Sequence, residues 1–153
     1  MRLLILNGPN LNLLGTREPE VYGTRTLDEL MAEVICYGRE HGIEAETIQA
    51  NGEGTLIDVL HKADAYYDGI VFNPAAYTHY SYALRDAIAS VSVPVVEVHI
   101  SDISAREDFR AVSVTEPVCL AQHSGGGVES YKQGIDTLVA HLAEQKPDTE
   151  TGE

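Results

Sequence analysis

The loop after the first apolar run carries side chains that could do chemistry. Residues 3–6 (Leu-Leu-Ile-Leu) are followed at once by the turn-rich segment 7–15, Asn-Gly-Pro-Asn-Leu-Asn-Leu-Leu-Gly. A simple strand-to-helix turn needs about 2–6 residues, yet the next helix signal here is Thr26, and Arg17 and Tyr22 lie in between. Long connections in compact α/β domains are usually lids or binding loops. We therefore interpret this segment as a loop that serves a site.

A carboxylate and an imidazole form a second chemical signal. Residues 95–99 read Val-Val-Glu-Val-His, so Glu97 and His99 point to the same face of a strand. A carboxylate in a buried strand is costly unless it is paired or hydrogen-bonded. Its most useful role is to orient a histidine and tune the protonation of the ring. We predict that both residues belong to a site.

Further polar residues follow the other predicted strands, where open α/β sheets bind their ligands. They are Asn7, Asn10, Asn73, His79, Ser101, Arg106, Arg110, Gln122 and His123. Plain structural roles also fit some of them: asparagines at strand ends make turns, and a histidine before a helix can cap or pack. We predict a polar site at this edge of the sheet.

Three other chemistries are not supported. The histidines lie at different strand ends, with no His-x-x-x-His pair and no cysteine partner, so no metal site is predicted. The lysines fall on predicted helices or in the tail, away from a Schiff-base position. The glycine run at 125–127 lacks the Lys-Ser/Thr of a phosphate loop, and segment 7–10 is not a dinucleotide fingerprint.

Composition narrows the class of protein. A chain of 153 residues fits one domain. The net charge of −14 argues against nucleic acid, and an anionic substrate must be captured locally by arginines or helix N-termini. Cys36 and Cys119 are interpreted as free buried thiols. No apolar run approaches the roughly 20 residues of a membrane span, and we expect a cytoplasmic protein.

The pattern of elements predicts the fold. Continuous apolar runs at 3–6, 70–72, 95–98 and 118–121 are typical of strands covered on both faces, whereas 43–49 alternates like an edge strand. Helices are expected from the capping box Thr26-x-x-Glu29 to Gly42, from Thr55, over 84–91 and over 131–142, with a short helical turn near 104–109.

This alternation predicts an α/β fold: a flavodoxin-like three-layer sandwich with a five-stranded parallel sheet of order 2-1-3-4-5. Residues 1–145 are expected to form a single catalytic domain, and residues 146–153 a disordered acidic C-terminal tail.

Several motifs together resemble the type II 3-dehydroquinate dehydratase family. They are residues 7–19 with Tyr22-Gly23, Asn51-x-Glu53-Gly54 with 56–58, Asn73-Pro-Ala-Ala-Tyr-Thr-His79 with 83–86, Glu97-Val-His-Ile-Ser101, and 105–110. They occur in the family's order and spacing and cover the chain to about residue 142.

The resemblance implies cofactor-independent dehydration of 3-dehydroquinate to 3-dehydroshikimate, by anti elimination through an enolate. Tyr22 would be the base that removes the C2 proton, with Arg17 lowering the pKa of the phenol; one nearby cation can lower such a pKa by about 1–3. His99 would protonate the departing C1 hydroxyl, and Glu97 would hold the imidazole. Asn10 would hold the water that stabilises the enolate.

The resemblance also implies the substrate contacts. Asn73, His79 and Arg110 would bind substrate hydroxyls, and the backbone amides of Ile100 and Ser101 would bind the carboxylate. The reaction would serve aromatic biosynthesis or quinate breakdown, without a metal or cofactor.

The family's assembly is a homo-oligomer, a dodecamer built of trimers, in which Asp86 would reach a neighbouring subunit's site. The chain departs from the common pattern at Gly52, Asp102, Ser104, His123 and Gly126. These departures bear on subunit contacts and packing more than on the reaction. Two alternatives stay open: a catalytically weakened relative, and a flavodoxin-like module that binds a small ligand.

Overall fold

The sheet is parallel throughout and has the predicted strand order. The computed structural model describes residues 1–16, 20 and 23–145. Within that part of the chain, one sheet has the order β2-β1-β3-β4-β5. Its strands are β1 (Arg2–Asn7), β2 (Glu44–Gln49), β3 (Gly69–Asn73), β4 (Val95–His99) and β5 (Ala121–Ser124). The half-exposed strand β2 lies at one edge, as the alternating pattern predicts.

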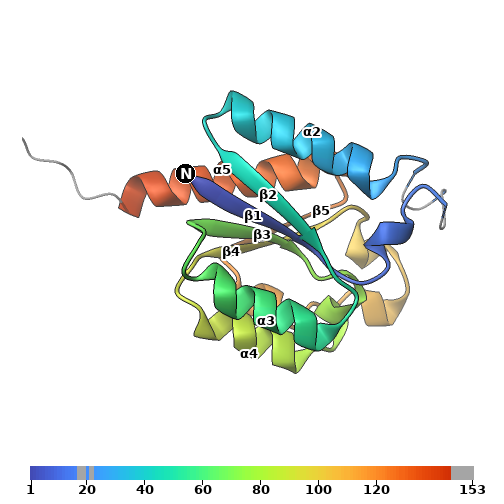
Figure 1. Ribbon diagram of the computed structural model, residues 1–153. Coiled ribbons are helices and arrows are strands. Elements are labelled where there is room, and N and C mark those ends of the chain that lie inside the picture. The colour runs from blue at the N-terminus through green and yellow to red at the C-terminus, as the bar shows by residue number, and fades with distance from the viewer. Residues whose placement is uncertain (17–19, 21–22, 146–153) are drawn as a thin grey trace, which may run out of the picture.

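Helices cover both faces of this sheet (Figure 1). Helices α2 (Leu27–Glu40) and α5 (Val128–Gln145) pack on one face, and α3 (Glu53–Ala63) and α4 (Tyr82–Ser90) pack on the other. Alternate residues of β1 enter the two cores: Leu3 and Ile5 pack toward α2 and α5, and Leu4 and Leu6 toward α3 and α4. The predicted three-layer sandwich is therefore confirmed.

Two helix starts illustrate what local sequence can and cannot specify. The Thr26 hydroxyl accepts a hydrogen bond from the Glu29 backbone N–H at 3.2 Å, which caps α2 as predicted. The predicted start of α3 at Thr55 is wrong. The helix begins at Glu53, because Gly52 occupies the N-cap position and its carbonyl accepts the Leu56 N–H at 3.0 Å.

The last strand and the cysteines also differ from expectation. Val118 ends a short 3-10 turn (Glu116–Val118), and β5 starts at Ala121, so the predicted strand over 118–121 lies too early. Pro117 in this turn has no N–H to give to a ladder. Just before β5, the Leu120 N–H donates to the Val95 carbonyl of β4 at 2.8 Å. Both thiols are free, but Cys36 is exposed on the outer side of α2, and Cys119 is half-buried. The expectation that both are buried is wrong.

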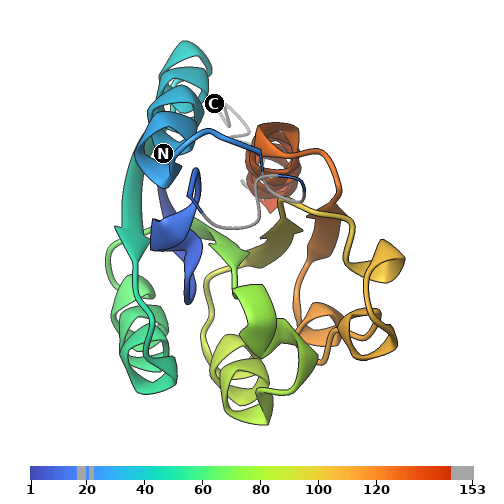
Figure 2. The same ribbon diagram turned by 90° about the vertical axis from the view of Figure 1, so that its right-hand side faces the viewer.

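The loops that follow the strands meet at one end of the sheet. Figure 2 looks onto this end, where the 3-10 turn Leu11–Leu13 faces the turns that follow β4. The helical turn expected near 104–109 consists of two 3-10 turns, Ile103–Ala105 and Asp108–Arg110. Among the described residues, no helix has both the length and the apolar character needed to cross a membrane.

Candidate active site

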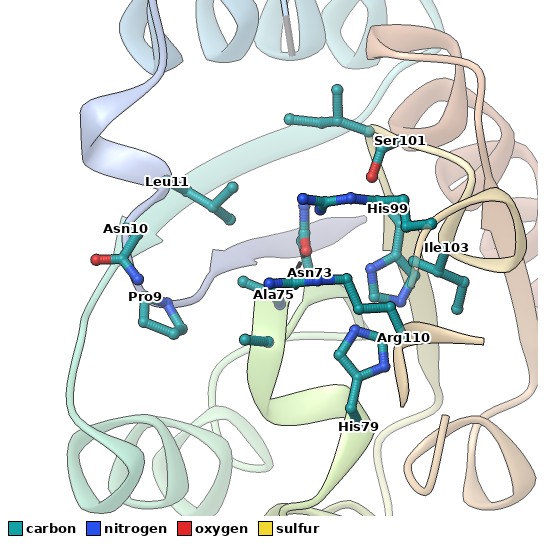
Figure 3. A pocket seen from close by; sticks show the side chains of 13 residues that line it. Pro9, Asn10, Leu11, Asn73, Ala75, His79, His99, Ser101, Ile103 and Arg110 are labelled. Carbon is teal, nitrogen blue, oxygen red and sulfur yellow. Dashed lines mark hydrogen bonds between the residues drawn. The ribbon is translucent and has the colours of Figure 1, made fainter. Parts of the chain in front are cut away.

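A cleft of about 480 Å³ opens beyond the carboxyl ends of β1, β3 and β4 (Figure 3). Its lining comes from three segments: Pro9, Asn10 and Leu11; Asn73, Ala75, Ala76 and His79; and His99, Ile100, Ser101, Ile103, Arg106 and Arg110. The topology therefore brings together most of the polar residues that the sequence placed at the strand ends.

Several predicted site residues are not in this lining. Arg17 and Tyr22 lie outside the described residues, so their predicted roles stay predictions. Asp86 lies on α4 and does not line the cleft of its own chain. Glu97 lies behind the lining, fully buried, and contacts the cleft through His99.

The carboxylate of Glu97 orients the ring of His99. Glu97 is 0% exposed and His99 is 4% exposed, and 3.0 Å separates Oε2 of the carboxylate from Nε2 of the ring. Burial alone would raise the pKa of Glu97, but hydrogen bonds from His99, Thr115 and Gln122 outweigh it and lower the pKa to about 2. An ionised carboxylate only accepts hydrogen bonds, so Nε2 carries a proton. This assignment leaves Nδ1 as the ring nitrogen for a ligand in the cleft.

His79 is held through Nδ1, whereas His99 is held through Nε2. Its Nδ1 lies 2.7 Å from the Val112 carbonyl oxygen, and a carbonyl only accepts, so Nδ1 carries the proton. Burial lowers the pKa of His79 and so favours the neutral ring. The hydrogen bond to Val112 raises the pKa and offsets part of this effect. A neutral ring with Nδ1–H has a lone pair on Nε2. His79 can therefore accept a hydrogen bond from a ligand hydroxyl.

A buried network supports Asn73 at the floor of the cleft. Its side-chain NH2 donates to the Tyr131 hydroxyl at 2.9 Å, and that hydroxyl donates to Oδ1 of Asn7 at 2.6 Å. Its Oδ1 accepts the Ala75 N–H at 3.0 Å. These bonds fix which end of the Asn73 amide is nitrogen, and they leave its second N–H for a ligand.

Sequence reasoning assigns Tyr131 to the core of the last helix and gives Asn7 no partner. The signal that could have indicated the pair is the register, since Asn7 and Asn73 lie opposite each other on β1 and β3. Burial raises the pKa of Tyr131 well above its ordinary value, so its hydroxyl stays protonated.

A close backbone approach brings the first loop to the cleft. The Gly8 N–H donates to the Asn73 carbonyl at 2.8 Å. A Cβ on Gly8 would lie 2.7 Å from the Pro74 carbonyl oxygen, so a side chain does not fit there. The next turn brings Asn10 to the cleft with a left-handed φ of 67°, and the Asn51 side chain accepts its N–H at 3.1 Å.

Among the described residues, two guanidinium groups line the cleft of this acidic chain. Arg110 pairs through Nε with Glu107 at 2.6 Å and lies over the Phe109 ring, with 4.9 Å to the ring centroid. Arg106 also lines the cleft, as predicted for the polar residues after the strands, although the family resemblance gives it no substrate contact. Because the overall negative charge repels an anionic ligand, such a ligand must be captured by local cations of this kind.

The glycine run at 125–127 binds the backbone that follows β4, between His99 and the two arginines. Gly127 and Gly125 donate their N–H groups to the carbonyls of Ile100 and Ser101, at 3.0 and 3.2 Å. His123 points elsewhere, because its Nε2 lies 2.9 Å from the Thr137 hydroxyl on α5. Within the described residues, no group of three or more His, Cys, Asp or Glu side chains could hold a metal ion.

The fold and the cleft define an α/β enzyme-like protein with a small-molecule site at the carboxyl ends of its strands. The family described as dehydroquinase class II matches residues 1–139. The chain is 56% identical over 137 residues to a 3-dehydroquinate dehydratase of Bacillus pumilus, covering 90% of this chain and 93% of that one. It is 47% identical over 152 residues to a protein of the same name from Carboxydothermus hydrogenoformans, covering 99% of each.

Solved structures agree with the sequence comparison. The crystal structure of the type II dehydroquinase from Butyrivibrio crossotus matches with a TM-score of 0.89 and 50% identity, covering 91% of this chain and 97% of that one. This chain belongs to the class II dehydroquinase family, a family of hydro-lyases.

Proposed function

We propose that this protein catalyses the cofactor-independent dehydration of 3-dehydroquinate to 3-dehydroshikimate, by anti elimination through an enolate. Family membership and relatives named 3-dehydroquinate dehydratase support the activity. The observation that carries the proposal is the Glu97–His99 pair, buried behind a cleft that also holds two arginines. A proton donor and local cations are what elimination of water from an anionic substrate needs.

In this proposal His99 acts as an imidazolium that carries a proton on each ring nitrogen. Its Nδ1–H proton passes to the departing C1 hydroxyl, which leaves as water, while the Nε2–H stays hydrogen-bonded to Glu97 and the ring becomes neutral. Tyr22 removes the C2 proton and Arg17 lowers the pKa of its phenol, as the family resemblance implies. A tyrosine has a pKa of about 10, so a nearby cation is needed to make the phenolate accessible at neutral pH. Asn10 holds the water that stabilises the enolate, consistent with its position in the cleft lining.

The remaining cleft residues would bind the substrate. Asn73 and His79 suit hydroxyl groups, because one offers an amide N–H and the other an imidazole lone pair. Arg110 adds a cationic donor from the loop after β4. The backbone amides of Ile100 and Ser101 would hold the carboxylate, beside carbonyls that the glycine run already binds.

The proposal extends to organisation. Residues 1–145 act as one catalytic domain in a cytoplasmic homo-oligomer, a dodecamer built of trimers, as the family resemblance implies. Asp86 would serve a neighbouring subunit's site, which fits its place on α4 outside the cleft of its own chain. The reaction would belong to the shikimate pathway or to quinate catabolism.

The test follows the ultraviolet absorbance of the conjugated enone after 3-dehydroquinate is added. The wild-type protein should produce the signal without added metal or cofactor, and borohydride should not trap an imine. Tyr22→Phe should lower kcat by about 10²–10⁴-fold, the range for a general base, while calorimetry still detects substrate binding. Tyr66→Phe, at an exposed tyrosine, is the matched control and should keep full activity. No absorbance change with micromolar wild-type protein would refute the proposed activity.

A further inference from the structure

The carboxylate of Glu97 has more partners than its pairing with His99 requires. Four other polar side chains surround it, which we call the cage: Thr78, Ser113, Thr115 and Gln122. Thr78 belongs to the motif at 73–79, and Gln122 is one of the polar residues predicted at the strand ends, but none of the proposed roles of the cleft residues involves the cage. None of its members lines the cleft.

The cage satisfies both oxygens of the carboxylate. Oε1 accepts hydrogen bonds from the hydroxyls of Thr78, at 2.9 Å, and Thr115. Oε2 accepts from Nε2 of Gln122 at 2.5 Å, in addition to His99. The Ser113 hydroxyl lies within 3.1 Å of Oε1 and 2.9 Å of Oε2. With both oxygens bound, the carboxylate group cannot rotate without breaking hydrogen bonds in a site that water does not reach.

The side chains of the cage can donate to the carboxylate, and the Thr78 hydroxyl also lies 2.7 Å from the hydroxyls of both Ser113 and Thr115. The Ser113 hydroxyl accepts the Glu116 N–H at 3.0 Å, so its own proton is free to be donated to Glu97. The side-chain nitrogen of Gln122 can only donate. Such an arrangement matches an ionised carboxylate and disfavours a protonated one.

The cage is assembled from separate parts of the fold. Thr78 lies in the 3-10 turn Ala75–His79 after β3, and Ser113 and Thr115 lie in the loop before β5. Gln122 lies on β5, directly opposite Glu97 in the register with β4. Three segments therefore converge on one carboxylate from both sides of its strand.

We infer that Thr78, Ser113, Thr115 and Gln122 are positioning residues: they lock the Glu97 carboxylate so that it holds the Nε2–H tautomer of His99 and presents Nδ1 to the cleft. The inference rests on the proposed function, since it gives the cage its purpose in delivering the proton. When the imidazolium gives its Nδ1 proton to the departing hydroxyl, the neutral ring that remains is the Nε2–H tautomer, and the locked carboxylate of Glu97 stabilises that tautomer. The cage would then control kcat without touching the substrate.

A purely structural role for the cage makes a different prediction. Donors around a buried carboxylate are needed for stability in any protein. In that case removal of one donor would lower the free energy of unfolding and leave kcat and the His99 tautomer unchanged. The two roles are therefore separated by measuring turnover and tautomer on folded variants.

Thr115→Val tests the inference, because valine keeps the shape of threonine and removes the hydroxyl. We expect kcat for 3-dehydroquinate to fall about 10- to 100-fold, the range for partners that orient a functional side chain, with KM changed less than about twofold. Thr115→Ser restores the hydroxyl and should restore most of kcat. Thr137→Val is the matched control. It removes a hydroxyl that has two hydrogen-bond partners, Gln133 and His123, on α5 away from Glu97, and it should leave kcat unchanged.

Nitrogen-15 NMR of the histidine rings supplies a readout that needs no turnover. Neutral His99 should be the Nε2–H tautomer in the wild type and a mixture of tautomers in Thr115→Val. If Thr115→Val does not fold, Ser113→Ala takes its place, since it removes the hydroxyl that reaches both oxygens. A folded variant with wild-type kcat and an unchanged tautomer would overturn the inference, as would a failure of Thr115→Ser to recover kcat. An inactive wild type would instead refute the proposed function, and the tautomer measurement would still test the cage.

Discussion

Replacing Tyr131 by phenylalanine removes one hydroxyl group from a place that solvent does not reach. Tyr131 is 0% exposed, and its hydroxyl bridges the side chains of Asn7 and Asn73, which are themselves buried. Phenylalanine fits the same space, so the packing of α5 against the sheet is retained. The change leaves Oδ1 of Asn7 without its donor, and one N–H of Asn73 without its acceptor.

The expected loss of stability follows from these two stranded groups. Leaving a buried polar group unsatisfied costs about 1–3 kcal/mol, and the space vacated by one hydroxyl oxygen is too small to admit a water. The two groups together give an expected decrease of roughly 2–6 kcal/mol in the free energy of unfolding. Tyr37→Phe is the control: its hydroxyl donates to Asp136 at 2.6 Å on the outer side of α2 and α5. There water can replace the lost partner, and we expect a decrease below about 1 kcal/mol.

Urea unfolding, followed by circular dichroism at one protein concentration for all variants, measures both changes. Tyr131→Phe should also raise KM for 3-dehydroquinate, because the Asn73 amide is no longer fixed and can turn its oxygen toward the cleft. Equal stability losses in the two phenylalanine variants would contradict the reasoning, since the buried and the exposed hydroxyl would then contribute equally to the free energy of unfolding. An unchanged KM would show that Ala75 alone fixes the amide.

Two further predictions concern the backbone and acid stability. Gly8→Ala should lower the free energy of unfolding by about 1–3 kcal/mol, because a Cβ would lie 2.7 Å from the Pro74 oxygen. Gly54→Ala is the control: the added Cβ meets open space, and the variant should not be destabilised in the same urea assay. Because the pKa of Glu97 is lowered from an ordinary 4.5 to about 2, its carboxylate should contribute about 3 kcal/mol of stability that is complete above pH 4.5 and lost as the pH falls toward 2. Unfolding measured across this range should depend less steeply on pH in Glu97→Gln, and an equal slope would exclude Glu97 as the source.

The fold is predictable from sequence where both faces of a strand are buried. The apolar runs of β1, β3 and β4 are continuous because helices cover the sheet on each side, and this continuity locates the strands. The sequence places the last strand too early because the apolar residues Val118 and Cys119, at the end of a 3-10 turn and just after it, also pack against the α3 and α4 core. Local composition does not distinguish these two environments; the ladder with β4 does.

The residues that line the candidate site can be predicted from the sequence, but the hydrogen bonds that hold them in place cannot. Parallel topology brings the carboxyl ends of strands together, so the order of the elements along the chain is enough to assign Asn73, His79 and His99 to one cleft. The supporting hydrogen bonds join residues far apart in the chain, such as Tyr131 and Asn7, which are 124 positions apart. Threonine, serine and glutamine carry no local signal of burial beside a carboxylate, so the sequence does not connect Thr115 or Gln122 with Glu97.

The position of Glu97 within the sheet explains how a buried charge can be retained. β4 is an inner strand, with β3 on one side and β5 on the other. The segment after β3 delivers Thr78, and β5 delivers Gln122, so donors reach the carboxylate from both flanks. The edge strand β2 has a neighbouring strand on one side only. Its carboxylate Glu46 is bound by Arg2 and Tyr67 and remains partly exposed. A fully buried carboxylate that orients an imidazole is therefore best placed near the carboxyl end of an inner strand. The cleft forms at the same end of the sheet.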